Sequence, residues 1–486
     1  MMIASSTSTQ VSSSMARIII GVFLHQERNA HVKLAINSSD SYLPHTTRRL
    51  AQRMLSSICG LDQMLVFTLR NRLGPRFIVA GAELTGVHVL LGQEQPGSYH
   101  IGGAGIFPHE AVIRSLGETV ERYSQLISAI AQLHPLPMVS YEDLVSHEQQ
   151  VLAPEKLAFF SREHYATPNF RFQPFDPQVP ITWTRTTSLI DGSSLWVPAQ
   201  LVLVGYMVKR HEGEPWMLPA VTTGSAAHTS HSHALRNALL ELIQVDAAMG
   251  HWYSGAAAPQ IRLDKRTQAL ERLIERQWIA PWPKVRFHWL PSPDLAGKIV
   301  ACVVTGAPRS IPAIAVGLGA DMRLVDAMYK ALLEAVGVLQ LARVNFVNQV
   351  SKSGSTNGYQ PEEIDPAAIF DLDSNVAYYA LPENSSALDQ HFATTQPAIP
   401  ASDLPPDPDT NLEGEVDLLI DSFRRSKKEL VYLDLTTKDI QQLGFTALRV
   451  WSPDTLGLAL PSVPPTHHPR FAAYGGATYR NPHPYP

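Results

Sequence analysis

Ser115, Glu118, Glu121 and Arg122 form the pattern Ser-x-x-Glu-x-x-Glu-Arg, the first set of residues in the chain that could do chemistry. Residues three apart lie on one side of an α-helix, so the serine and the two glutamates would share a stripe. Two carboxylates this close repel each other unless a positive charge lies between them. Mg²⁺ prefers oxygen ligands and often binds one or two carboxylates together with substrate phosphates. The pattern therefore suggests a Mg²⁺ site, although alone it is more typical of a solvated helix face with local ion pairs.

Glu241 and Gln244 repeat the same spacing within the stretch 232–252, whose other residues are largely apolar. A helix that is apolar on most sides is buried, and a buried glutamate needs a partner or a cation. If the two helices face each other, Glu118, Glu121, Glu241 and Gln244 would form one cradle for a Mg²⁺-bound nucleotide.

Two weaker motifs do not enter the predicted site. His228, His231 and His233 could bind a transition metal, but no cysteine or second histidine pair lies nearby in the sequence, so cap and loop contacts are favoured. The glycines at 102–105 superficially resemble a phosphate-binding loop. They lack both the GxGxxG spacing and the Lys-Ser/Thr pair of a P-loop.

Long helices must position these side chains. Pro108 suits the first turn of a helix, and the absence of another proline before Pro135 predicts a helix that extends to Leu133, preceded by a glycine-rich turn. A second helix is expected over 232–252 and a third over 322–347. The third contains Lys330 and Glu334, one turn apart, which fit an ordinary helical ion pair.

The remaining apolar runs predict shorter elements. These are strands at 17–24, 77–80, 87–91, 285–290, 298–306, 312–320, 430–435 and 447–451, a hairpin around Asp191-Gly192, and helices at 46–58, 417–427 and 438–443. The stretch 385–413 has the composition of a mobile linker or lid. The proline-rich tail, 461–486, is expected to be extended. The fold class is therefore α/β (α+β), with mixed or antiparallel sheets and long helices that bracket the site.

Composition places the chain in a class of cytoplasmic globular proteins. A formal net charge of −5 over 486 residues argues against nucleic acid as the main partner. Cys59 and Cys302 cannot make a disulfide framework and fit a reducing compartment as inert core residues. The first fifteen residues lack the charged and apolar regions of a signal peptide. The apolar run at 16–24 is too short to span a membrane.

The stretches GGAGIFPHEAVIRSLGETVERYS and TTGSAAHTSHSHALRNALLELIQVDAAMGHW resemble the two nucleotide-binding helices of the YcaO-domain family. The first matches the family pattern Ser-x-x-Glu-x-x-Glu-Arg. The second departs from the frequent Glu-x-x-Glu-Arg-Asp, because Gln244 and Val245 replace the second glutamate and the arginine. Ala104 stands where the family often has lysine. The ending Pro482-x-Pro484-x-Pro486 resembles the azoline-forming branch of this family.

The resemblance implies an ATP-dependent cyclodehydratase of the azoline-forming kind. It implies an N-terminal region at 1–70 packed on the core, a catalytic domain at 71–460 and a tail at 461–486. Mg²⁺ would be bound by Glu118, Glu121, Glu241 and Gln244. The cofactor-binding residues would be Ser115, Glu118, Glu121, Arg122, Glu241, Gln244 and, from the third helix, Glu334. Pro482, Pro484 and Pro486 would enter the site and order the cyclisation machinery.

In this interpretation ATP activates a backbone amide of a ribosomal precursor peptide, so that a Cys, Ser or Thr side chain closes a thiazoline or oxazoline ring. The resemblance also implies a separate leader-binding partner of the E1-like (ocin-ThiF) type and an FMN-dependent azoline dehydrogenase, and it leaves a homodimer open. Two alternatives stay open: a YcaO enzyme that forms thioamides or amidines, and a silent scaffold that binds nucleotide. The PxPxP ending argues against the first, and the intact Ser115-to-Arg122 set argues against the second.

Overall fold

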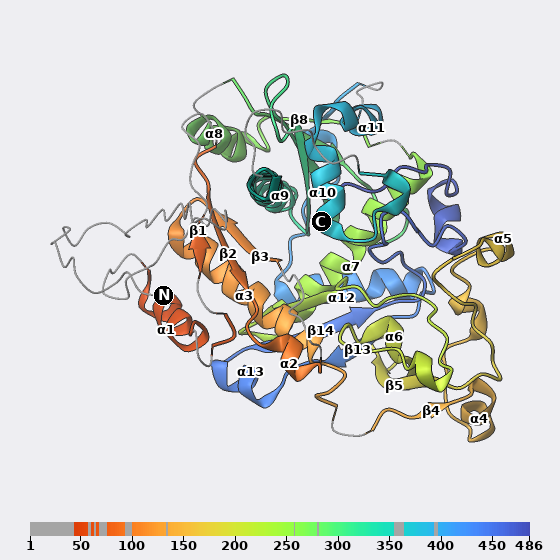
Figure 1. The fold of residues 1–486 in the computed structure, drawn as a ribbon. Helices are drawn as coiled ribbons and strands as arrows, with labels where there is room; N and C mark the ends of the chain where they lie inside the picture. Colours follow the sequence, from red (N-terminus) through yellow and green to blue (C-terminus); the bar gives the residue numbers. More distant parts are fainter. Residues whose placement is uncertain are drawn as a thin grey trace.

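The computed structural model describes residues 43–56, 60–62, 65–67, 75–92, 100–132, 135–256, 258–278, 281–353, 364–392 and 397–486 (Figure 1). Helix α7 (His231–Ser254) lies at its centre, between two sheets. Its apolar residues join one buried cluster with inward-facing residues of both sheets, among them Leu448 and Leu318. This explains why the stretch is apolar on most sides and confirms the predicted second helix.

The larger sheet has the strand order β4-β5-β13-β14-β7, with β6 paired to β5. Its strands are β4 (Met138–Val139), β5 (Ile181–Ser188), β6 (Ser194–Pro198), β7 (Ser225–His228), β13 (Val431–Asp434) and β14 (Thr446–Trp451). The pair β5–β6 is the hairpin predicted around Asp191-Gly192. Helix α3 (Pro108–Leu126) and helix α7 both contact β7, and they join buried clusters on opposite faces of this sheet.

The second sheet is antiparallel, with the order β11-β10-β9. It consists of β9 (Lys284–Trp289), β10 (Lys298–Thr305) and β11 (Ile314–Asp321), close to the three predicted β runs. Helix α9 (Leu324–Ser353) covers the face opposite α7. Gly317 and Gly319 allow α9 to approach β11 closely, because a Cβ at either position would lie about 2 Å from the helix backbone. This helix confirms the third predicted helix and extends beyond it.

The N-terminal described residues add a sheet with the order β1-β2-β3, made of β1 (Val66–Phe67), β2 (Ile78–Glu83) and β3 (His100–Gly105). The glycine-rich turn predicted before α3 is therefore wrong, since these glycines form strand β3. Their lack of side chains serves packing: a Cβ on Gly103 would lie 2.2 Å from the carbonyl oxygen of Ala111 and 2.4 Å from the Ser115 nitrogen. Helix α3 thus lies directly on β3.

Shorter elements complete the described part of the chain. They are α1 (His45–Met54), α2 (Val87–Leu90), α4 (Tyr141–Ser146), α5 (Arg162–Ala166), α6 (Ala199–Val202), β8 (Ile261–Arg262), α8 (Gln268–Gln277), α10 (Leu372–Ala380), α11 (Ser386–His391), β12 (Ile399–Pro400), α12 (Leu412–Arg425) and α13 (Lys438–Leu443). Strands β8 and β12 pair in parallel. None of the described helices is both long and apolar enough to cross a membrane.

Several predicted elements differ from the structure. The strand at 87–91 is wrong, because Gly86 adopts a left-handed φ of 69° and leads into helix α2. Helix α3 ends at Leu126 rather than Leu133. The stretch 385–413 contains α11, β12 and the start of α12. The Arg266 side chain donates hydrogen bonds to the carbonyl groups of Ala401, Leu404 and Pro405. The described part of this stretch is therefore not a free linker. The strand predicted at 17–24 and Cys59 lie outside the described residues.

The tail does not stay extended throughout. A 3-10 helix forms at Pro469–Tyr474, and Arg470 explains its position, because its guanidinium donates to the buried carboxylate of Asp246 on α7 at 2.6 Å. Beyond this helix the chain returns to the centre of the molecule. The C-terminus lies near α10 and α7 (Figure 1), where the indole of Trp252 donates to the Asn481 carbonyl oxygen.

Candidate active site

Three helices bring the predicted glutamates to one place. Arg122 Nη2 and Glu118 Oε1, one turn apart on α3, are 3.2 Å from each other. The same guanidinium interacts electrostatically with Glu121 and with Glu241 of α7. Glu334 of α9 interacts with Glu118 and Arg122. We call Glu118, Glu121, Glu241 and Glu334, grouped around Arg122, the acidic cluster.

The backbone and a neighbouring amide hold two members of the cluster in place. The Gly102 N–H of strand β3 donates to Glu118 Oε2 at 2.9 Å. Gln125, one turn after Glu121, extends its Nε2 toward Glu121 Oε1 at 3.4 Å and toward the Thr222 carbonyl oxygen at 3.3 Å. The approach of α3 to the glycine strand thus fixes where its carboxylates lie.

Three carboxylates of the acidic cluster have too little positive charge around them to offset their burial. Burial raises the pKa of Glu121 to about 7, with Glu118 adding to the shift and Arg122 opposing it. Burial also raises the pKa of Glu334 to about 7, against an opposing hydrogen bond from the Leu318 backbone. For Glu241, burial and then Glu121 raise the pKa, while Arg122 and Arg449 lower it. Each shift means that further positive charge would stabilise the ionised state.

These residues fit a Mg²⁺-bound nucleotide. Ser115 Oγ and Gln125 Oε1 are buried next to the cluster without a hydrogen-bond partner among the described residues. When all side chains are ionised, the four carboxylates exceed the charge of Arg122 and Arg449 by two, the charge of one divalent cation. No three acidic, histidine or cysteine side chains of the described chain enclose a metal by themselves. Mg²⁺ here would therefore share its coordination with phosphate oxygens, as it often does.

Some residues singled out in the sequence do not join the cluster. Within the described part of the chain, no hydrogen bond links Gln244 to it. Lys330 lies one turn before Glu334 but donates to Asp321 Oδ2 at 2.7 Å instead of pairing with that glutamate. The His228 and His233 rings stack at 4.6 Å, and both side chains hydrogen-bond to Ser230 at the start of α7, in agreement with the cap and loop contacts favoured for the histidines.

Sequence reasoning missed Arg449, which interacts with Glu241 from strand β14. Its side chain is almost fully buried, and burial lowers its pKa to about 10, with Glu241 opposing the shift. One Nη donates to the Val202 carbonyl oxygen at 2.9 Å, while Nε has no partner among the described residues. The only available signal was a lone charge in the otherwise uncharged strand TALRVW.

The Pro482-x-Pro484-x-Pro486 segment is buried between α7 and α10, and only Pro486 is partly exposed. The hydroxyl of Tyr379 on α10 donates to the Pro482 carbonyl oxygen at 2.6 Å. The amide of Asn375 donates to the carbonyl oxygens of His483 and Tyr485, both at 2.8 Å. Three backbone carbonyls of the tail are thus fixed by one helix.

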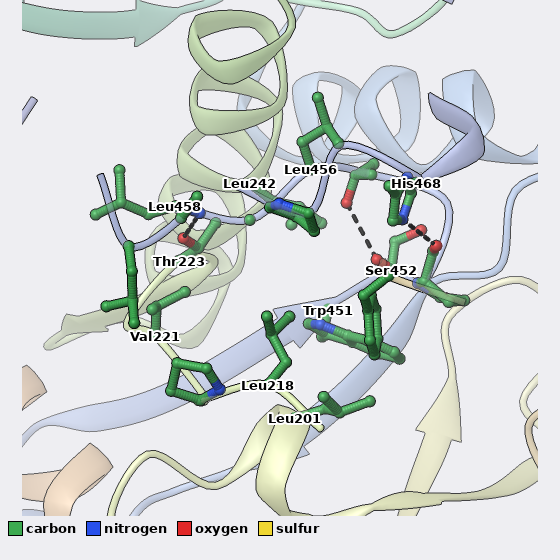
Figure 2. A pocket seen from close by; sticks show the side chains of 18 of the residues that line it. Leu201, Leu218, Val221, Thr223, Leu242, Trp451, Ser452, Leu456, Leu458 and His468 are labelled. Carbon is green, nitrogen blue, oxygen red and sulfur yellow. Dashed lines mark hydrogen bonds between the residues drawn. The ribbon is translucent and has the colours of Figure 1, made fainter. Parts of the chain in front are cut away.

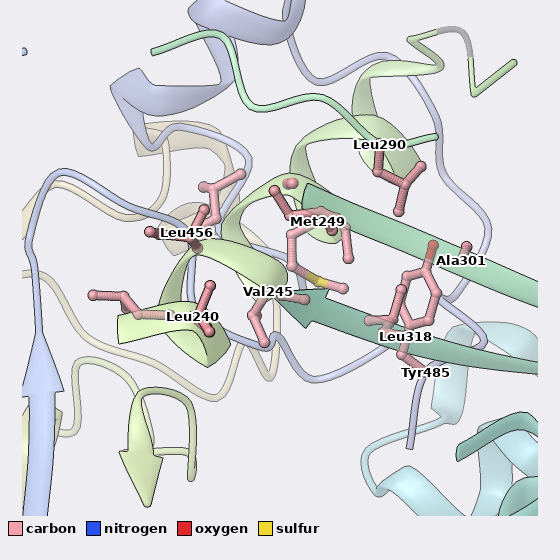
Figure 3. Packing of buried hydrophobic residues seen from close by; sticks show 14 of the residues in the cluster. Leu240, Val245, Met249, Leu290, Ala301, Leu318, Leu456 and Tyr485 are labelled. Atoms are coloured by element: carbon pink, nitrogen blue, oxygen red, sulfur yellow. The ribbon is translucent and has the colours of Figure 1, made fainter. Parts of the chain in front are cut away.

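Tyr485 connects this tail to the acidic cluster. Its ring packs beside Leu318 and Ala301, on the side of the sheet that faces Met249 (Figure 3). Its buried hydroxyl has no hydrogen-bond partner among the described residues. Burial raises the pKa of Tyr485, and Glu334 adds to the shift. The sequence singled out the prolines of the tail, but the tyrosine between them is the residue that interacts with Glu334.

Comparison with known proteins identifies the class. The family model described as YcaO cyclodehydratase, ATP- and Mg²⁺-binding, matches residues 102–456. The chain therefore belongs to the YcaO family, as the helix motifs predicted. A search of the curated proteins found no match.

Solved structures share the fold at low sequence identity. A heterocyclase in complex with substrate and cofactor is 19% identical with a TM-score of 0.64, over 85% of this chain and 52% of its own. YcaO from Methanopyrus kandleri, bound with AMPPCP and Mg²⁺, is 18% identical with a TM-score of 0.56, over 84% and 88%. The E. coli microcin synthetase McbBCD complex is 11% identical with a TM-score of 0.56, over 89% and 99%. The chain thus spans about half the length of the first of these neighbours.

Proposed function

We propose that this chain is an ATP-dependent peptide cyclodehydratase that forms azoline rings. The observation that carries the proposal is the acidic cluster of a YcaO-family chain, whose carboxylates have too little positive charge around them and lie beside unpartnered buried polar atoms. Such a site suits phosphoryl transfer, which depends on positioning and charge stabilisation more than on a protein nucleophile.

The proposed reaction removes one amide oxygen from a peptide. The side chain of a Cys, Ser or Thr attacks the preceding amide carbonyl, and the oxygen of the resulting adduct attacks the γ-phosphate of ATP. ADP leaves first. The C–O bond then breaks, phosphate carries away the amide oxygen, and the amide nitrogen and the attacking side chain each lose a proton. The peptide becomes lighter by one water.

We assign different roles in this reaction to the residues of the cluster and its neighbours. Mg²⁺, when bound, would offset the charge of the transferring phosphoryl group. Its ligands would be Glu118, Glu121 and Glu241 and, one turn after Glu241 on α7, Gln244, which has no hydrogen bond to the cluster within the described part of the chain. Ser115, Arg122 and Glu334 would hold and orient the nucleotide. The unpartnered Ser115 hydroxyl and the position of Arg122 among carboxylates support these roles.

The tail is proposed to order the site. Prolines fix φ, so Pro482, Pro484 and Pro486 stiffen the chain on either side of Tyr485 and reduce the entropy lost on docking. The interaction of Tyr485 with Glu334 supports an influence of the tail on the catalytic groups. The substrate would be a ribosomal precursor peptide recruited by a leader-binding E1-like partner, with an FMN-dependent azoline dehydrogenase in the same complex. The neighbouring McbBCD complex with pro-MccB17 bound is consistent with a peptide-modifying assembly.

The test is an assay of the purified chain with Mg²⁺-ATP and synthetic peptides that each contain one Cys, Ser or Thr, at concentrations high enough to replace recruitment. The expected result is phosphate release in step with peptides that lose one water. Glu121→Gln should abolish both, whereas Glu110→Gln, on the same helix but outside the cluster, should retain them. Phosphate release without a lighter peptide, or sulfur incorporation at the amide, would reject the cyclodehydratase assignment.

A further inference from the structure

A cavity of about 60 Å³ lies between strand β14, helix α7 and the segment 452–468 (Figure 2). Its wall comes from the end of β14, Leu242 in the middle of α7, the segment 218–223 and the segment 452–468. Most of the lining is apolar, including Leu218, Val221, Leu242 and Leu458. A ligand in this cavity would therefore be mainly apolar.

The polar side chains of this wall are almost all occupied by the protein itself. Thr223 Oγ1 accepts from the Leu458 N–H, and Ser452 Oγ accepts from the Asp454 N–H. Thr455 and His468 are hydrogen-bonded to the carbonyl groups of Ser452 and Pro453. Among the buried polar side-chain atoms of the wall, only Arg449 Nε has no partner within the described part of the chain. The Arg449 Nε–H is thus the one buried side-chain group of the wall without any partner among the described residues, while the Thr223 and Ser452 hydroxyls already accept and could each still donate.

Its size excludes the nucleotide base. A cavity of roughly 150 Å³ binds benzene, whereas roughly 10–15 Å³ suffices for one water. At about 60 Å³ the cavity is too small for a purine but large enough for an aliphatic group such as a methyl or isopropyl. A phosphate would also be a poor occupant, because most of the lining is apolar and a charged group buried there would lose its hydration.

The cavity adjoins the site where the reaction would occur. Arg449, which lines it, interacts with Glu241, and Leu242 follows Glu241 in α7. Thr223 lies next to Thr222, whose carbonyl oxygen accepts from Gln125 at the other side of the cluster. A group bound in the cavity would therefore lie next to the residues that are proposed to hold Mg²⁺ and the phosphates.

We propose that this cavity binds the peptide residue that precedes the cyclising Cys, Ser or Thr, with its small aliphatic side chain against Leu218, Val221 and Leu458 and its carbonyl oxygen on Arg449 Nε–H. The proposal rests on the proposed function and deepens it, since that residue supplies the amide oxygen that is removed. Arg449 would orient the carbonyl, and the cavity would select Ala or Val over larger residues.

Gly457 offers a way to fill the cavity without strain. A Cβ at this position would lie 3.7 Å from Val221 Cγ2, an ordinary contact with another side chain of the wall. Gly457→Ala therefore adds one methyl group to the cavity. Gly117→Ala on α3 is the matched control, because a Cβ there meets nothing within 4 Å.

The experiment measures binding of blocked single residues, the N-acetyl methylamides of Gly, Ala, Val and Phe, by ligand-observed NMR with AMPPCP and Mg²⁺ present. The wild type should bind the Val compound about ten-fold more tightly than the Gly compound. This difference lies at the lower end of the selectivity that hydrophobic pockets show for additional apolar groups. Gly457→Ala should weaken binding of the Val compound by about ten-fold, with AMPPCP affinity unchanged. Gly117→Ala should leave both affinities unchanged.

Absence of binding, equal binding of the Val and Phe compounds, or equal affinity of wild type and Gly457→Ala for the Val compound would overturn the proposal. Arg449→Lys and Arg449→Met provide a second comparison, with folding monitored by Tm. Lys, which can still donate, should retain more affinity than Met. None of these outcomes depends on peptide turnover, so they are distinguishable from failure of the cyclodehydratase assay.

Discussion

Two sets of buried charges on helix α7 differ in how well the protein satisfies them. Asp246 accepts hydrogen bonds from the Arg470 guanidinium, the Tyr474 hydroxyl and the Leu456 N–H, at 2.6 to 3.1 Å. Glu241, five residues earlier, lies among other carboxylates that raise its pKa further after burial. The same helix thus carries one carboxylate whose partners belong to the protein and one whose partners are incomplete.

A second satisfied group lies near the start of α7. Arg236 contacts both Asp321 and Glu415, and Lys330 also donates to Asp321. Burial alone would raise the pKa of Asp321, but Arg236 and Lys330 outweigh it and lower the pKa to about 2. The comparison shows that this fold neutralises buried carboxylates whose role is to connect secondary-structure elements. It leaves the acidic cluster under-neutralised, which is expected where a cation must bind.

The largest predicted effect distinguishes a glutamate of the acidic cluster, Glu241, from a glutamate with a protein counter-ion, Glu415. Glu241→Gln should lower ATP turnover by about 10³-fold or more, yet retain or raise the Tm, because it removes repulsion from Glu121. Glu415→Gln, the matched control, should lower the Tm, because it weakens the pair with Arg236. Steady-state phosphate release and thermal unfolding on the same samples provide the measurement. Wild-type turnover by Glu241→Gln would break the comparison.

The second prediction concerns Asp246. Asp246→Asn should reduce the free energy of unfolding by about 3–5 kcal/mol, because it leaves the buried Arg470 guanidinium without its main counter-ion. Urea unfolding followed by tryptophan fluorescence measures this loss. A variant as stable as the wild type would show that the Asp246 pair does not hold the tail onto α7.

The third prediction concerns the end of the tail. Removal of Pro482–Pro486 should lower cyclisation by about 10²-fold, the scale expected when catalytic groups are misplaced by roughly 1 Å. AMPPCP affinity should change little, because all the predicted Mg²⁺ and nucleotide ligands except Glu334 lie on α3 and α7. Both quantities are measured on one truncated sample. Unchanged cyclisation would reject a role in catalysis, and an equal loss of both would indicate a structural role.

The smallest predicted effect uses Asp62, a buried carboxylate that accepts from the Thr119 hydroxyl at 2.7 Å. Burial raises its pKa from 3.8 to about 7. Between these values the folded state keeps a proton that the unfolded state has released, so stability falls as the pH rises. A shift of about three pKa units corresponds to roughly 4 kcal/mol. Because Asp62 Oδ1 has no partner among the described residues, the Asn side chain would leave a buried polar atom unsatisfied, so Asp62→Asn should remove this slope and be more stable than the wild type at pH 8 by about 2 kcal/mol. Urea unfolding at pH 4 and pH 8 checks it, and an unchanged slope would contradict it.

The sequence predicted the parts of this molecule that depend on local patterns. Pro108 correctly marked the start of α3, and the apolar character of 232–252 correctly indicated a buried α7. The spacing of Glu118 and Glu121 placed both on one helix face. The family resemblance pointed to Glu334 on a third helix, and the structure brings it next to Glu118.

What the sequence could not provide depends on contacts between distant residues. Arg449 is far in sequence from Glu241, and only the packing of β14 against α7 brings them together. The 3-10 helix of the tail forms where Arg470 reaches Asp246, which no local pattern indicates. The largely apolar run at 87–91 favoured a strand, but the left-handed conformation of Gly86 leads the chain into a helix turn.

The most direct test of the central claim is calorimetry of AMPPCP binding with Mg²⁺ at pH 7, in buffers of different ionisation enthalpy. Glu121 and Glu334 have pKa values of about 7, so in the free protein both are partly protonated at this pH. A cation bound at the acidic cluster would ionise them, and binding should release on the order of one proton. Glu121→Gln should reduce this release and Glu415→Gln should not. Binding without proton release, or with the same release in Glu121→Gln, would contradict the claim that the under-neutralised cluster is the Mg²⁺-nucleotide site.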